Sequence, residues 1–177
     1  MIKKITWAVF ILLALFMNFQ AHVLKYATGQ QYTIVQLETA NKCMGQAILK
    51  EWKSLPYGEG TMLDVAISNT HWDFLFILCY VTLIIIQSYD QMQREQWMPL
   101  NALLRLNLFL AFLAGFFDIC ENTMLLHNFS HVIDGRYYLE TWWATYPKFI
   151  LSGWAVLVWL VSLVKSGWQY IFFQPSG

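Results

Sequence analysis

Four long runs of apolar residues limit the folds that this chain can adopt. The runs cover about residues 5–24, 71–88, 103–126 and 147–165. A helix of about 20 residues, rising ~1.5 Å per residue, crosses the ~30 Å hydrocarbon core of a bilayer. Because a helix satisfies its own backbone polar groups in lipid, we expect an all-α fold, a four-helix transmembrane bundle forming one domain over residues 1–177.

The composition agrees with a membrane location. Hydrophobic residues make up 58% of the 177 residues and charged residues only 12%, whereas soluble domains are about 45–50% apolar and about 25% charged. The net charge is zero, which removes any general attraction to nucleic acid. We therefore expect membrane lipids as partners and no nucleic acid, with a protein partner or self-association left open.

Lysines at the start of the chain leave two interpretations of the first run. Lys3 and Lys4 followed by a short apolar stretch resemble a signal peptide. The end of the run lacks the small residue that a cleavage site needs three positions upstream, so we expect an uncleaved first helix. With Arg94, Arg105 and Lys165, these lysines favour cytoplasmic termini, although lysines in the first loop oppose this bias.

The loop between the first two runs carries a helical pattern. Over residues 33–55 apolar side chains recur at helical spacing, namely Leu37, Ala40, Met44, Ile48, Trp52 and Leu55. Thr33 is a suitable N-cap, and Pro56 ends the pattern. The sequence therefore predicts one amphipathic helix over 33–55, which rests on the outer membrane surface or caps the bundle.

The third run holds three polar residues on one helical face. Asp118, Glu121 and Asn122 stand at i, i+3 and i+4. An ionisable residue at the centre of a membrane helix costs roughly 2.5–3.5 kcal/mol on insertion scales, so each needs a reason. Asp118 and Glu121 are candidate catalytic or metal-binding carboxyls, and Asn122 is a candidate ligand-binding residue. The structural alternative is that all three hold neighbouring helices together by hydrogen bonds.

Three further residues extend this candidate site. Asp73 and Tyr80 lie seven residues apart, almost two turns, and so share a helical face. Thr70 and Asp73 also fit a capping box, which is the structural alternative for Asp73. Lys148 follows Pro147, a residue suited to a first helical turn. Lys148 reaches the membrane interface, is a counter-ion for Asp118 or Glu121, or anchors a phosphate.

The topology brings these polar groups to one side of the membrane. Because successive helices run in opposite directions, Asp73, Asp118, Glu121, Asn122 and Lys148 all lie in the outer half of the bundle or at its boundary. The inner half has almost nothing ionisable, which argues against a through-pore.

Metal ligands are not evident in the sequence. A divalent metal at Asp118 and Glu121 is possible but has no further support in the sequence, so the cofactor stays unknown. His127 and His131 are four residues apart, but His127 lies about 180° round the helix from Asp118, which makes a shared site awkward. We therefore predict no metal site.

The intramembrane motifs resemble a known pattern. Residues 73–80 match D-F-x-F-x-x-x-Y, residues 118–122 match D-x-x-E-N, and Lys148 is a late lysine. This combination resembles uncharacterised bacterial four-helix integral membrane proteins, over about half of the chain. The resemblance implies a multi-pass protein of the bacterial inner membrane and assigns no reaction.

Two hypotheses from different classes remain. In the first, an outward-facing polar pocket under the loop helix binds, or acts on, a lipid headgroup or other amphiphile. In the second, the protein is a non-enzymatic scaffold or a subunit of a larger complex, and its polar residues are structural. A small transporter subunit is a third alternative. No P-loop, H-E-x-x-H or G-x-S-x-G motif is present, so the sequence does not decide whether the protein is an enzyme.

Overall fold

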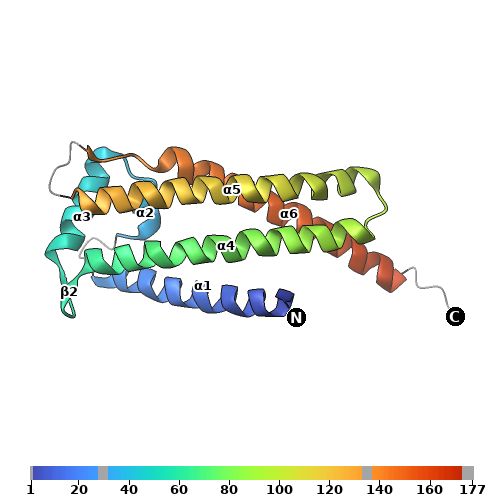
Figure 1. Cartoon of the computed structure of the whole chain (residues 1–177), viewed down its shortest axis with the longest axis horizontal. Coiled ribbons are helices and arrows are strands. Elements are labelled where there is room, and N and C mark those ends of the chain that lie inside the picture. The colour runs from blue at the N-terminus through green and yellow to red at the C-terminus, as the bar shows by residue number, and fades with distance from the viewer. Residues whose placement is uncertain (1, 28–31, 133–136, 173–177) are drawn as a thin grey trace.

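Four long antiparallel helices form the body of the molecule, as Figure 1 shows. A computed structural model of the chain describes residues 2–27, 32–132 and 137–172. All four helices are long and apolar enough to cross a membrane. The predicted all-α four-helix bundle is therefore confirmed. The helices are α1 (Ile2–Ala27), α4 (Met62–Arg94), α5 (Met98–Ser130) and α6 (Trp142–Phe172).

All four helices begin earlier than the sequence predicted, and in α4 and α6 this changes the interpretation of a residue. Helix α4 starts at Met62 instead of residue 71, so Thr70 lies inside it and caps nothing. The N-terminus of α4 is instead capped at Thr61, whose backbone N–H donates to Asp64 Oδ2 at 2.7 Å. Pro147 likewise lies in the interior of α6 and not in its first turn. Its ring nitrogen has no hydrogen to donate to the preceding turn.

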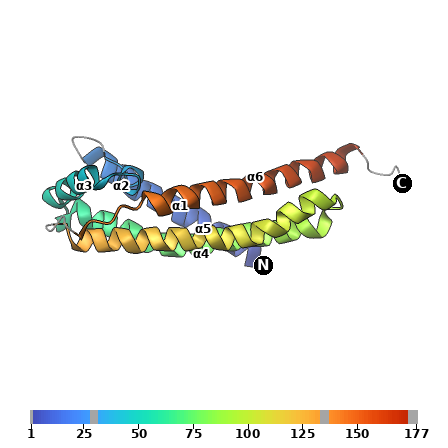
Figure 2. The same cartoon turned by 90° about the horizontal axis from the view of Figure 1, so that it is seen from above.

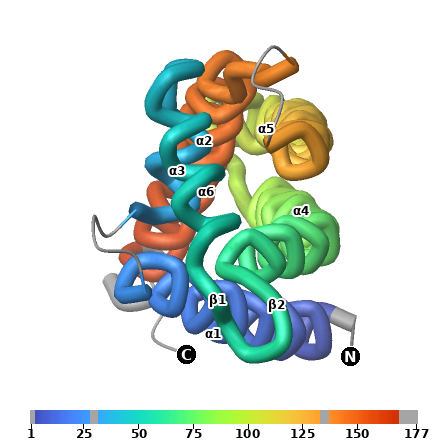
Figure 3. Tube along the Cα trace, turned by 90° about the vertical axis from the view of Figure 1, so that its left-hand side faces the viewer, coloured from blue at the N-terminus to red at the C-terminus, as the bar shows by residue number. Residues whose placement is uncertain are grey.

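A small folded segment covers one end of the bundle. This segment, residues 32–61, is called the cap below. It contains α2 (Ile34–Glu38), α3 (Lys42–Ser54) and a hairpin of β1 (Pro56–Tyr57) and β2 (Gly60–Thr61). Figure 3 views the molecule from this end and shows the cap lying across the helix ends. The first turn of α1 and the last turn of α6 lie at the opposite end (Figure 1).

The cap corrects the prediction of one helix over residues 33–55. Thr33 does cap a helix, with Gln36 N donating to its hydroxyl at 3.2 Å. However, α2 ends at Glu38, and a new cap forms where Met44 N donates to the Asn41 side chain at 3.0 Å. Asn competes well for an N-cap position, which favours a second helix start over a continuous helix. In the hairpin, Gly58 adopts a φ of 59°, the left-handed region that glycine tolerates best.

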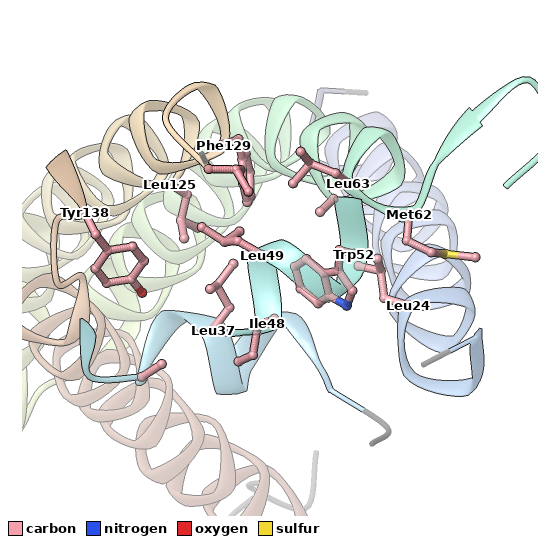
Figure 4. Close-up of a cluster of buried hydrophobic side chains, with 13 residues drawn as sticks. Leu24, Leu37, Ile48, Leu49, Trp52, Met62, Leu63, Leu125, Phe129 and Tyr138 are labelled. Atoms are coloured by element: carbon pink, nitrogen blue, oxygen red, sulfur yellow. The ribbon is translucent and has the colours of Figure 1, made fainter. Parts of the chain in front are cut away.

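The cap is fixed to the bundle by a hydrophobic core. Figure 4 shows Trp52, Ile48 and Leu49 of α3 pointing toward apolar side chains from α1, α4 and α5. Trp52 is fully buried. Gly45 lets α3 pack closely against the side chain of Tyr138, because a Cβ at this position would lie 1.9 Å from the Tyr138 hydroxyl. Burial on this scale indicates that the cap is an integral part of the fold.

Beneath the cap, α4 and α5 form the centre of the bundle, with α1 packed on α4 and α6 on α5. A Cβ at Gly115 of α5 would meet Val81 of α4 at 2.8 Å, so these helices are in close contact. Asn107 of α5 donates to the carbonyl of Ala155 in α6 at 2.8 Å. Figure 2 shows α6 leaning away from α4 and α5 toward its C-terminal end.

The end of the bundle away from the cap is joined by ion pairs. Lys3 Nζ lies 2.8 Å from Asp90 Oδ2 and connects α1 to α4. Lys165 of α6 pairs with Glu95 in the turn between α4 and α5. Lys3 and Asp90 are exposed and can be solvated by water or headgroups, whereas Glu95 is buried and paired with Lys165. They were not part of the predicted site.

Candidate functional site

Lys148 is at the centre of a buried ionic cluster beneath the cap. Its Nζ lies 2.9 Å from Asp118 Oδ1 and 2.9 Å from Glu121 Oε2. The contact with Asp118 is a hydrogen bond, whereas that with Glu121 is an ion pair without hydrogen-bond alignment. Lys148 is 7% exposed and Glu121 is fully buried. Of the alternatives for Lys148, the structure supports that of a counter-ion for both carboxyls, because the residue is buried and not at the interface.

The other predicted residues lie around the same cluster. Tyr80 of α4 donates its hydroxyl hydrogen to the second oxygen of Asp118, at 3.0 Å. Asn122 of α5 donates its amide to Asp73 Oδ2 at 2.8 Å. Helices α4, α5 and α6 thus bring all six residues predicted from the sequence into one region.

One site residue comes from the cap and was not predicted. Glu38, the last residue of α2, places its carboxylate 3.8 Å from Lys148 Nζ. Its backbone carbonyl, which has no helical partner, accepts hydrogen bonds from the Thr141 and Thr145 hydroxyls at 2.6 and 3.2 Å. These threonines attach the end of α2 to the start of α6 and so direct Glu38 toward Lys148.

The cluster carries more acid than base. Four carboxyls, those of Glu38, Asp73, Asp118 and Glu121, are gathered in the region of one lysine. Burial raises the pKa of Glu38 above its usual range, although the nearby charge of Lys148 opposes the shift. Glu38 Oε2 is buried and accepts no hydrogen bond from the described part of the chain, although Lys148 Nζ lies 3.8 Å away. A buried carboxyl oxygen without a hydrogen bond is costly, so this position favours a proton or a cationic ligand.

A cavity of about 590 Å³ adjoins the cluster. Its charged lining residues, Glu38, Asp73, Asp118 and Lys148, all lie toward the capped end. Most of the remaining lining is apolar or aromatic and comes from α1, α4 and α6, including Trp7, Phe10, Phe76, Ile84, Phe149, Val156 and Trp159. From Lys148 to Trp159 the cavity follows α6 for eleven residues, or ~16 Å.

The cavity wall continues to the surface of the bundle. Phe149 and Val156, which both line the cavity, are 50% and 39% exposed. They belong to α6, and the opposite wall is formed by α1, a helix that packs on α4 and not closely on α6. The cavity therefore reaches the surface on the side between α1 and α6, where apolar side chains are exposed.

Glu121 does not line the cavity and lies behind Lys148, away from any ligand there.

Within residues 2–27, 32–132 and 137–172, no three His, Cys, Asp or Glu side chains are arranged to hold a metal ion. His127 forms a hydrogen bond with the Tyr137 carbonyl and stacks on His131, with ring centroids 4.3 Å apart.

Comparison of the chain with family models, with curated proteins and with solved structures gave no match.

Proposed function

We propose that this membrane protein binds an amphiphile, such as a membrane lipid, in an outward-facing polar pocket beneath the cap. The observation that carries the proposal is the polarity of the cavity along its length. Charged side chains lie at the capped end, and apolar and aromatic side chains line the deeper part. An amphiphile has the same distribution, because a small polar head is joined to an apolar tail. Ligand pockets of ~300–1,000 Å³ with a few polar groups in an apolar lining are typical of small-molecule sites.

The proposed roles follow from the contacts. Asp118, held by both Lys148 and Tyr80, and Asp73, held by Asn122, present fixed oxygens to a polar head. Glu121 compensates the lysine from behind and so fixes its position. The resemblance to bacterial four-helix membrane proteins supports a location in the inner membrane. The basic residues near the helix ends, Lys3, Lys4, Arg94, Arg105 and Lys165, favour cytoplasmic termini, and the cap then faces outward.

The scaffold hypothesis is supported by a different observation. Lys148 is paired within the protein by Asp118 and Glu121, and such pairing is also expected of residues that only hold helices together. In that case filling the cavity should have no effect on lipid association. The two hypotheses therefore differ in an experiment that changes the cavity and leaves the ionic cluster intact.

Replacing Gly153 by leucine is expected to weaken lipid binding by about ten-fold or more, because the new side chain occupies space that the ligand would fill. A loss of ~1.4 kcal/mol in binding free energy is enough for a ten-fold effect. Gly153 lines the cavity, and a Cβ there meets no atom within 4 Å, so the new side chain enters open space. Gly167→Leu is the matched control, because Gly167 lies on the same helix, also has open space and is not part of the cavity lining.

The measurement is native mass spectrometry of the detergent-solubilised protein titrated with a bacterial phospholipid extract. We expect fewer specifically bound lipids on Gly153→Leu than on Gly167→Leu, with equal thermal stability for the two variants. Equal lipid occupancy in both would contradict the pocket and support the scaffold hypothesis.

A further inference from the structure

We infer, resting on the proposed amphiphile pocket, that the head group it selects is a cationic amine. An anionic head group would be repelled by the carboxylates that line the cavity. Of the described residues that line the cavity, three are acidic, namely Glu38, Asp73 and Asp118, and only Lys148 is basic. Glu121 adds a fourth carboxyl directly behind this lysine. A protonated amine brings the positive charge that this surrounding lacks.

Lys148 is not available to bind a phosphate or carboxylate. Its ammonium group already has Asp118 and Glu121 at 2.9 Å each and Glu38 at 3.8 Å. A new anion would have to displace one of these carboxylates and leave it buried without a partner, which is strongly unfavourable. The positive charge in the site is therefore already neutralised, and an excess of acceptor oxygens remains.

Glu38 supplies an acceptor that points to a ligand independently of the charge count. The residue is 8% exposed and lines the cavity. Its Oε2 accepts no hydrogen bond from the described residues, and its nearest cation, Lys148 Nζ, is 3.8 Å away, beyond hydrogen-bond distance. An ammonium group is a donor with up to three hydrogens and no acceptor, so it matches a carboxylate oxygen that lacks a hydrogen bond. Hydrogen bonds of this charge-assisted kind are about twice as strong as neutral ones.

Aromatic side chains complete a surrounding that suits an organic cation. Phe76, Tyr80 and Phe149 line the cavity close to the carboxyls in sequence or in space. Lys148 Nζ already lies 5.0 Å from the centre of the Phe149 ring, so this ring faces a cation in the structure. Aromatic faces attract ammonium groups and also accept the methylene groups next to them. The apolar part of the cavity beyond accommodates the tail of a long-chain amine and gives a small hydrophilic amine no contacts.

The test compares ligands that share one tail and differ in head charge. Tetradecylamine, tetradecanol and myristate are titrated into the full-length protein in maltoside detergent, with binding followed by native mass spectrometry. We expect the amine to bind about ten-fold more tightly than either of the others, because one additional charge-assisted hydrogen bond changes the affinity by about that factor. Butylamine, which lacks the tail, should not compete.

Glu38→Gln is expected to weaken tetradecylamine binding by about ten-fold and to leave tetradecanol binding unchanged. The variant keeps the backbone carbonyl that Thr141 and Thr145 bind, so α2 stays attached. Glu59→Gln is the matched control, since it removes the same charge from an exposed position of the cap. Lysophosphatidylethanolamine binding as tightly as tetradecylamine would identify a lipid head group as the source of the amine, and weak binding would identify a free long-chain amine.

The outcomes separate the inference from the function on which it rests. Equal binding of all three tetradecyl ligands, or preference for myristate, would overturn the amine inference and leave the amphiphile pocket standing. Failure of all three to bind would overturn both. A loss of amine binding in Glu38→Gln that Glu59→Gln does not share would support the inference.

Discussion

The variant Lys148→Met is expected to lose about 3–5 kcal/mol of unfolding free energy, the range measured when one partner of a buried ion pair is removed. Methionine fills a similar volume, so the loss comes from charge and not from a cavity. Asp118 and Glu121 would each lose a cation at 2.9 Å, and Glu121 is fully buried. Such a loss would be a large fraction of the 5–15 kcal/mol that typically separates folded from unfolded domains.

This expectation is checked by denaturant titration of the purified protein in detergent. Lys50→Met is the control, because Lys50 lies on the exposed side of α3, and its change should be close to zero. Adding Asp118→Asn and Glu121→Gln to Lys148→Met should restore part of the loss, since the neutralised carboxyls no longer need a cation. A single variant as stable as the wild type would show that the carboxyls are already protonated or solvated, which contradicts the ionic cluster.

A second large effect is expected in the cap. Trp52→Ala should cost about 3–5 kcal/mol of cap stability, the usual range for truncating a buried tryptophan. Trp52 is fully buried in the core shared by α3 and the ends of the long helices (Figure 4). Because the membrane-spanning parts of α4, α5 and α6 pack on one another below this core, they should remain folded when the cap detaches.

Hydrogen exchange followed by mass spectrometry distinguishes local from global loss. We expect faster exchange in α3 of the Trp52→Ala variant, with unchanged protection in the middle of α5. Trp143→Ala is the control, because Trp143 is 45% exposed and its removal should change neither region. Uniform loss of protection along the chain would mean that the cap and bundle unfold as one unit, and no loss would mean that Trp52 is not part of a stabilising core.

Hydropathy was sufficient to predict the fold class because membrane-spanning helices depend mainly on length and apolar composition. The helix ends were less accurate. Residues 62–70 contain polar positions, and the sequence did not show that this part of α4 packs against the cap. Met62, Leu63 and Ala66 are buried there against cap residues. This end of α4 packs on protein instead of lipid, so a search for apolar membrane spans underestimates the length of the helix.

The candidate site was partly predictable. Helical spacing placed Asp118, Glu121 and Asn122 on one face, and the antiparallel order of the helices brought Asp73, Tyr80 and Lys148 to the same end. The role of Glu38 depends on the break between α2 and α3 and on Thr141 and Thr145, more than 100 residues away in the chain. No local pattern contains that information, because a glutamate beside an apolar stripe normally faces water.

The central claim, that an amphiphile occupies the cavity beneath the cap, is tested most directly by photolabelling. Tetradecylamine carrying a diazirine next to the amine is bound to the protein in detergent, irradiated, and its attachment sites are mapped by mass spectrometry. We predict labels on cavity residues of the capped end, chiefly Glu38, Asp73 and Asp118, which excess unlabelled tetradecylamine removes. Labels confined to exposed residues on the outer surface of the bundle, such as Leu12 and Phe109, and unaffected by competition, would contradict the account.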